Sequence, residues 1–122
     1  MTEAELVEAA MNAGESVLGN VMAYLSVVSA YLIVAYVAGA GLSRFQVFVI
    51  NVLFIVFGFS FVFAIQTGLA NHYLFASEIL EYRPDYVVFS SPSVNRLLLA
   101  IDSGGVLAAL VFMWNVRHPK TE

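Results

Sequence analysis

The sequence contains no cysteine and few charged residues. Among its 122 residues, five are Lys or Arg and nine are Asp or Glu, so only 11% are charged. The absence of cysteine excludes disulfides, thiolate metal sites and cysteine nucleophiles. Average soluble domains carry roughly a quarter charged residues, because a small domain has a large surface that water must solvate. With 61% hydrophobic residues and a mean hydropathy of +0.85, this chain is expected to be a membrane protein.

Basic residues are too few and too scattered for a nucleic-acid partner. The formal net charge is −4, and Lys and Arg form no cluster along the sequence. Nucleic-acid binding requires a basic patch that neutralises phosphates. The sequence also has no nucleophile elbow, phosphate loop or dinucleotide fingerprint. We therefore expect no nucleic acid, no cofactor, no metal and no catalytic residues.

Three long apolar stretches predict three membrane-spanning helices, at residues 17–41, 45–67 and 92–116. A helix of about 20 apolar residues crosses the roughly 30 Å hydrocarbon core of a bilayer. A helix is favoured because backbone groups in lipid must find their partners within the segment. The predicted fold class is an all-α integral membrane protein, a three-transmembrane-helix bundle that forms a single membrane domain over residues 1–122.

The start of the chain predicts an amphipathic helix over residues 2–14 with an acidic polar face. Thr2 and Glu5 have the spacing of a capping box, and Gly14 provides a stop signal. Interfacial helices usually carry Lys and Arg to meet anionic lipids. The acidic face therefore leaves two interpretations, a solvated turn that continues into the first span or a docking face for a partner.

The polar segment between the second and third spans forms an outer connection, residues 68–91. Its first half keeps helical spacing of apolar residues, so the second span is expected to extend as a helix to about residue 82. Ser91 followed by Pro92 predicts the N-cap and first position of the third helix. Residues 117–122 form a basic C-terminal tail.

The distribution of Lys and Arg predicts the orientation, because these residues are retained on the cytoplasmic side. With three spans, Arg44, Arg117 and Lys120 share one side, against Arg83 and Arg96 on the other. The first 15 residues hold four glutamates and no basic residue, unlike a cleaved secretory signal. We expect a multi-pass protein of a bacterial-type inner or plasma membrane, with the N-terminus out and the C-terminus in. The reverse orientation is the alternative.

Asp102 is the only charged residue well inside a predicted span. A carboxylate there costs several kcal/mol unless it is protonated, paired or facing water. It either handles protons or cations, or fixes helix packing. The candidate intramembrane polar site comprises Asp102, Ser103, Asn51, Ser26 and Ser29, and the same side chains can instead supply hydrogen bonds between helices.

Small residues recur at helical spacing on two of the predicted spans. Ala100, Gly104 and Ala108 form a stripe on the third helix, and Ala35 with Gly39 forms a shorter one on the first. Such stripes let membrane helices approach closely. These five positions are the predicted helix-packing residues.

The tetrapeptide at residues 101–104, Ile-Asp-Ser-Gly, resembles the apolar-Asp-Ser/Thr-Gly signature of aspartic proteases. Those enzymes carry the aspartate on a loop of an all-β domain. Here Asp102 lies between apolar segments of helical length. We therefore expect that the chain is not an enzyme.

Three spans alone would leave Asp102 and the small-residue stripes partly exposed. A homo-oligomer or a complex with a larger membrane-protein partner is therefore expected within the lipid bilayer. The favoured function is that of a non-enzymatic subunit, scaffold or regulator acting through helix packing. The alternative is an oligomeric pore or an ion- or proton-handling protein that uses Asp102.

Overall fold

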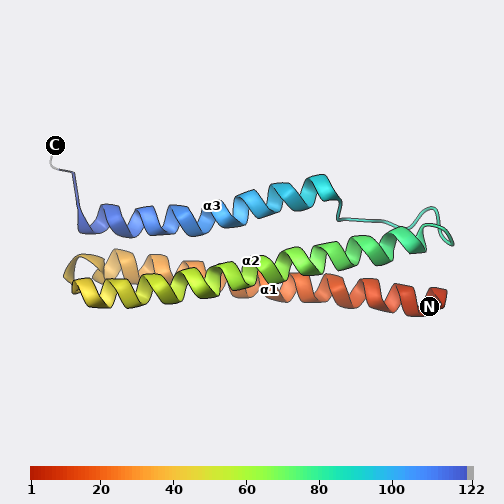
Figure 1. Ribbon diagram of the computed structural model, residues 1–122, viewed down its shortest axis with the longest axis horizontal. Coiled ribbons are helices and arrows are strands. Elements are labelled where there is room, and N and C mark those ends of the chain that lie inside the picture. Colours follow the sequence, from red (N-terminus) through yellow and green to blue (C-terminus); the bar gives the residue numbers. More distant parts are fainter. Residues whose placement is uncertain (121–122) are drawn as a thin grey trace.

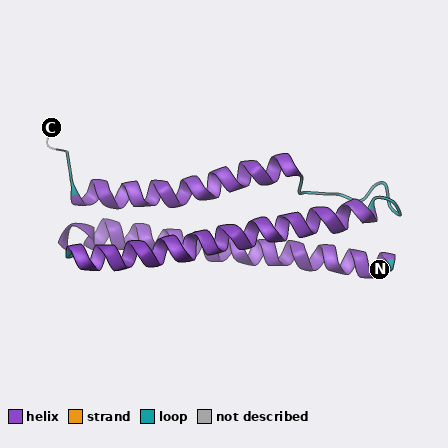
Figure 2. Ribbon diagram, viewed as in Figure 1, coloured by secondary structure: helices purple, strands orange, loops and turns teal. Residues whose placement is uncertain are grey.

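The structure, a computed structural model, describes residues 1–120 and consists of three long α-helices (Figure 1). Helix α1 spans Glu3–Ala38, α2 spans Arg44–Ile79 and α3 spans Pro92–Arg117, with a 3-10 turn, η1, at Gly39–Gly41. Residues 1–120 contain no strand (Figure 2). The predicted all-helical class is confirmed, and each of the three helices is long and apolar enough to cross a membrane.

The first two helices begin at capping boxes. At α1, the Thr2 hydroxyl accepts a hydrogen bond from the Glu5 backbone N–H, and the Glu5 carboxylate accepts one from the Thr2 N–H. Ser43 and Gln46 make the same reciprocal pair at the start of α2. Each box satisfies backbone donors that the first helical turn leaves without partners. These side chains set where α1 and α2 start.

Helix α1 is continuous through Gly14, so the expected stop there is not formed, and the N-terminal turns continue into the first apolar stretch as one of the two interpretations predicted. The amphipathic segment and the first apolar stretch form one 36-residue helix. A glycine inside a helix costs only about 1 kcal/mol relative to alanine. Within this helix Gly14 packs against the Phe89 ring, and a Cβ on Gly14 would lie 3.4 Å from that ring.

Helix α2 ends at Ile79 and is followed by turns through residue 82.

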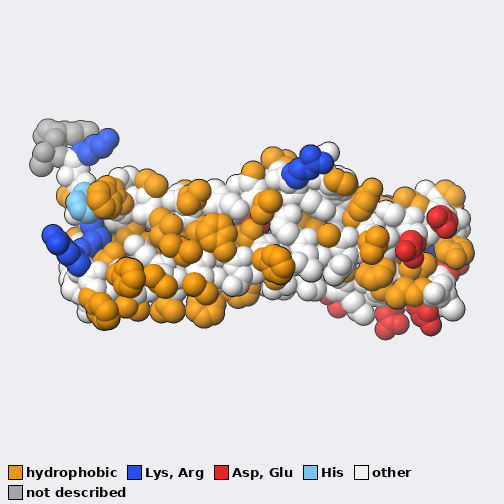
Figure 3. Space-filling view, in the orientation of Figure 1, with side chains coloured by type: hydrophobic (Ala, Val, Ile, Leu, Met, Phe, Trp, Pro, Cys, Tyr) orange, Lys and Arg blue, Asp and Glu red, His pale blue; other side chains and the backbone are white. Residues whose placement is uncertain are grey.

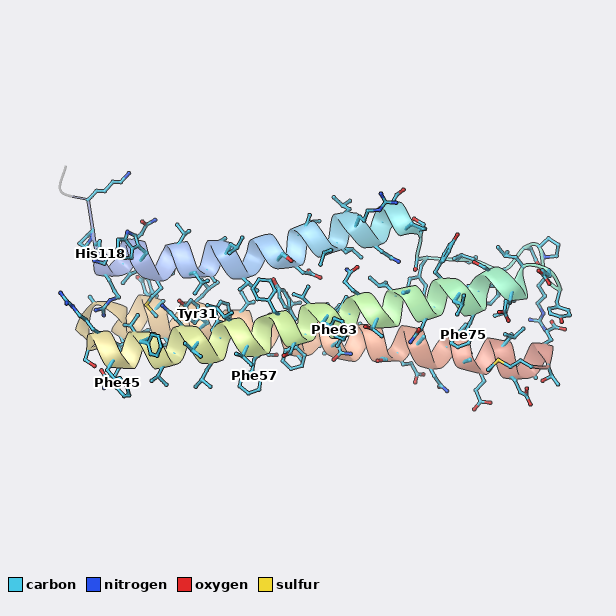
Figure 4. The ribbon with its side chains drawn as sticks, viewed as in Figure 1. Tyr31, Phe45, Phe57, Phe63, Phe75 and His118 are labelled. Carbon is cyan, nitrogen blue, oxygen red and sulfur yellow. The ribbon has the colours of Figure 1, made fainter. Side chains whose placement is uncertain are left out.

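Helices α1 and α2 form an antiparallel hairpin, and α3 lies along the part of it nearest η1 (Figure 1). A Cβ on Gly58 of α2 would lie 3.1 Å from Val106 of α3, and one on Gly68 would lie 2.6 Å from Val17 of α1. These glycines therefore allow close helix approach. Tyr31 lies between the helices, and the exposed Phe45 points away from them (Figure 4).

The hairpin is longer than α3 and projects beyond its first turn. At about 1.5 Å per residue, a helix of 36 residues is roughly 15 Å longer than one of 26 residues. The projecting end has a small core of its own, made by Leu6, Ala10 and Ile79. On the face drawn in Figure 3, Asp and Glu side chains gather at this end, whereas Lys and Arg gather at the opposite end and over the first turns of α3. Arg83 also lies at the acidic end, in a salt bridge with Glu3. The two ends of the molecule therefore differ in charge.

Candidate functional site

Asp102 lies on the side of α3 that faces α1. The residue is half-buried, and its backbone oxygen accepts a hydrogen bond from the Tyr24 hydroxyl. Within residues 1–120 its carboxylate takes part in no hydrogen bond and no salt bridge. The backbone oxygen of Asp102, and not its carboxylate, therefore joins α3 to α1.

The contact between Tyr24 and Asp102 requires a glycine. Tyr24 is 6% exposed, and a Cβ on Gly105 would overlap its hydroxyl oxygen. Glycine thus leaves the space that the tyrosine ring needs to reach the backbone of α3. Ser103, the other polar residue beside Asp102 in the predicted site, is half-buried.

Asn51 joins α2 to α1 through a hydrogen bond with Tyr31, which is not one of the predicted site residues. Its Oδ1 accepts a hydrogen bond of 2.7 Å from the Tyr31 hydroxyl. The Tyr31 ring stacks on Phe54, with centroids 3.9 Å apart and planes 14° from parallel. Tyr31 is seven residues beyond Tyr24 on α1, which is about 10 Å along the helix. Asn51 and Asp102 therefore lie at different levels of the bundle.

The structure does not gather the predicted polar site within one chain. Ser26 and Ser29 are exposed, and the Ser26 hydroxyl donates to the Met22 oxygen of its own helix. A hydroxyl bonded in this way is satisfied without a second helix. The polar path drawn through Ser26, Ser29, Asn51 and Asp102 is therefore not formed inside the chain.

The predicted small-residue positions divide into two groups. Ala35 and Gly39 are buried in the core, whereas the whole stripe of Ala100, Gly104 and Ala108 is exposed. A Cβ on Gly104 would meet nothing within 4 Å. The stripe thus faces away from α1 and α2.

Sequence reasoning missed the two tyrosines that hold the bundle. Tyr24 and Tyr31 are seven residues apart, and Ala35 continues the same stripe four residues later. That spacing marks one face of a helix. The sequence therefore contained the inward-facing stripe. Ser26 and Ser29 form a second stripe of polar residues at similar spacing, and the apolar residues around the helix do not show which stripe faces inward.

His72 fastens the outer connection to the hairpin. It is 3% exposed, its Nδ1 donates to the Ala10 oxygen at 3.0 Å, and its ring stacks on Phe89 with centroids 3.8 Å apart. Beside it, the Ser90 hydroxyl donates to the Leu69 oxygen at 2.7 Å. These contacts join α1, α2 and the connection into one packed unit.

Two grooves lie at opposite ends of the molecule. The first, here the acidic groove, has a volume of about 460 Å³ and is lined by Glu3, Ala4, Val7, Glu8, Met11, Asn12, Glu15 and Arg83. The second, here the basic groove, has a volume of about 370 Å³ and is lined by Arg44, Val47, Asn51, Leu110, Met113, Trp114, Arg117 and His118. A salt bridge of 2.6 Å between Arg83 Nε and Glu3 Oε1 borders the acidic groove.

Comparison with protein-family models, with curated proteins and with solved structures finds no match to this chain. The functional argument therefore rests on the geometry of the helices, the two grooves and the polar residues between helices.

Proposed function

We propose that this chain is a small non-enzymatic multi-pass membrane protein that acts as a docking subunit. Its three apolar helices anchor it in the bilayer, and the projecting end of the α1–α2 hairpin binds a protein partner. The observation that carries the proposal is the length of the hairpin. Helices of 36 residues exceed the roughly 20 residues needed to cross the hydrocarbon core.

The projecting end is built as a folded surface. Leu6, Ala10 and Ile79 are each at most 2% exposed, and His72 and Ser90 tie the outer connection to the same helices. Partners that meet a preordered surface lose less conformational entropy on binding. This packing supports a docking role better than a solvated tail would.

The acidic groove supplies the chemistry for a partner. The carboxylates of Glu8 and Glu15 line it, beside the Glu3–Arg83 salt bridge and the apolar side chains of Val7 and Met11. Opposite charges across an interface steer association and exclude wrong partners. The matching partner is a cationic protein segment with an apolar stripe, since anionic lipid headgroups would be repelled.

The orientation that fits this function has the N-terminus out and the C-terminus in, in a bacterial-type inner or plasma membrane. Arg44, Arg117 and Lys120 belong to the end opposite the acidic groove. Basic residues are retained on the cytoplasmic side. In this orientation the acidic groove faces the outside.

Within the bilayer, α3 offers a face for a second copy or a larger membrane protein. Ala100, Gly104 and Ala108 are exposed there, and small residues support close packing of membrane helices. Native mass spectrometry tests this association as an increase above the 13.3 kDa of one chain. Gly104→Leu should dissociate the complex, whereas Ile101→Leu, an exposed position on the same helix, should leave it intact.

Site-specific photo-crosslinking in native membranes tests the docking function. A photoreactive residue at Met11, in the acidic groove, should give one discrete protein adduct that the same residue at Leu80, exposed beyond the end of α2, does not give. The adduct should disappear when Glu8 and Glu15 are changed to Gln. No adduct from Met11, or an identical one from Leu80, would overturn the proposal.

A matched charge control separates the groove from general acidity. Glu78→Gln with Glu81→Gln removes the same two charges from the same end, at positions that do not line the groove. This variant should keep the Met11 adduct. If it loses the adduct as fully as Glu8→Gln with Glu15→Gln does, attraction by the whole acidic end accounts for the binding and the groove does not.

Ion or proton handling is a second candidate because α3 carries a second unpartnered polar side chain, about 10 Å from Asp102 along the helix. Asn95, seven residues earlier on α3, has a buried Oδ1 with no hydrogen-bond partner among residues 1–120. Uncompensated polar groups between apolar helices mark ion and proton pathways. Asp102→Asn should then abolish flux in proteoliposomes, while Ser60→Ala, at an exposed serine of α2 outside the candidate site, should preserve it. Equal flux in Asp102→Asn and the unaltered protein would exclude this role.

A further inference from the structure

The basic groove combines positive charge with an apolar floor. It lies between the first turns of α2 and the last turns of α3, with Arg44 on one helix and Arg117 on the other. Val47, Leu110 and Met113 supply the apolar lining. Two guanidinium groups beside apolar side chains suit a ligand that is anionic at one end and hydrocarbon at the other.

Arg117 is held in place by the end of α1 and η1. Its Nη1 donates to the backbone oxygens of Gly39, at 2.8 Å, and Leu42, at 2.6 Å. Among residues 1–120 only Nη1 takes part in these bonds, and a guanidinium has five N–H donors. Nε and Nη2 therefore remain available to an anion, on a side chain whose position is already fixed.

Aromatic rings form the other wall of the groove. Trp114 stacks on His118 with centroids 3.9 Å apart, and the tryptophan is 62% exposed. Tryptophan is enriched at the level of lipid headgroups. Arg44 is the first residue of α2, where the partial positive charge of a helix N-terminus adds to its own. The groove thus lies at headgroup level when the helices cross a bilayer.

We infer that the basic groove binds an anionic phospholipid. Its phosphate lies between the guanidinium groups of Arg44 and Arg117, and an acyl chain runs along Val47, Leu110 and Met113. Basic pockets between membrane helices are suited to anionic headgroups, and arginine recognises phosphate through several N–H groups at once. A zwitterionic headgroup would bring its own cation against the two arginines and bind more weakly.

Native mass spectrometry of the full chain with added lipid tests this site. Phosphatidylglycerol should remain bound as the detergent is stripped away, and phosphatidylcholine should not. Because each Arg near an anionic headgroup contributes roughly a fivefold effect, Arg44→Gln should weaken phosphatidylglycerol binding about fivefold. Arg96→Gln, which removes the same charge from α3 outside the groove, should leave binding unchanged.

Two further measurements distinguish the lipid from a soluble anion and the site from a folding defect. Soluble glycerol phosphate carries the same anionic group without the acyl chains and should not compete, whereas equal competition would overturn the lipid assignment. Circular dichroism should be unchanged in Arg44→Gln, whose side chain makes no hydrogen bond within residues 1–120. Equal binding of both lipids, or equal loss in Arg44→Gln and Arg96→Gln, would overturn the site itself.

Discussion

Replacing Gly105 with alanine tests the contact between α1 and α3 directly. A Cβ there would overlap the Tyr24 hydroxyl, which is hydrogen-bonded to the Asp102 backbone oxygen. Tyr24 is almost completely buried, so its ring cannot move without displacing neighbours. Gly19 in α1 is the control, since a Cβ on it would have nothing within 4 Å and it lies outside the small-residue stripe of α3.

The expected magnitude follows from comparing the two alanine variants. Both glycines lie inside a helix, Gly19 in α1 and Gly105 in α3, so the gain in helix propensity, about 1 kcal/mol, is common to both and cancels. Overpacking a filled site costs about 1–3 kcal/mol, and a hydrogen bond between membrane helices contributes about 0.6 kcal/mol. The free energy of unfolding of Gly105→Ala should therefore be about 2–4 kcal/mol lower than that of Gly19→Ala.

Titration with a denaturing detergent, followed by the fluorescence of the single tryptophan, Trp114, measures both unfolding free energies. Adding Tyr24→Phe removes the hydroxyl that the new Cβ overlaps. It should raise the stability of Gly105→Ala and lower that of the unaltered protein by about 0.6 kcal/mol. Equal stability of the two alanine variants would refute the reasoning, as would a Tyr24→Phe effect of the same sign and size in both backgrounds.

Three other contacts lead to measurable predictions. Arg117→Gln loses charged hydrogen bonds to two backbone oxygens and should lower the free energy of unfolding by about 1.5–3 kcal/mol, whereas Arg44→Gln should change it by less than about 0.5 kcal/mol in the same titration. Tyr31→Phe removes the bond to Asn51 but keeps its ring, so a loss of about 0.6 kcal/mol is expected there. Ser90→Ala releases the outer connection from α2, so hydrogen exchange in residues 80–91 should accelerate about fivefold for a bond of about 1 kcal/mol, with exchange in α3 unchanged.

The helix boundaries follow from local chemistry that a sequence displays. Thr2 with Glu5 and Ser91 with Pro92 were predicted as helix starts, and α1 and α3 begin at these positions. Each signal involves residues a few positions apart, so no tertiary contact is needed to interpret it. Gly14 was the exception, since α1 continues through it and the Phe89 ring of the outer connection packs against it.

The inward faces of the helices could not be predicted with the same ease. In a soluble helix, polar residues mark the outer face, but in a helix that is apolar all round this contrast is lost. Tyr24 and Tyr31 face inward on α1, whereas the smaller hydroxyls of Ser26 and Ser29 are exposed. Serine satisfies its hydroxyl on its own helix, while a tyrosine hydroxyl reaches past its ring to a neighbour. Side-chain length alone does not identify the inward face, because Tyr36 on the same helix is 77% exposed.

Small residues occur as adjacent pairs on α3, and the pairing bears on what surrounds this helix. Gly104 is followed by Gly105, and Ala108 by Ala109. Consecutive residues are about 100° apart around a helix, so each pair supplies one small residue to each of two faces. Gly105 and Ala109 pack inside the chain, while Gly104 and Ala108 are exposed. Lipid accommodates large side chains such as Ile101 as readily as small ones, so contact with lipid gives no reason for a second small face. Close packing of a second helix against α3 would require small residues on this face. We therefore infer that the chain works within a larger membrane assembly.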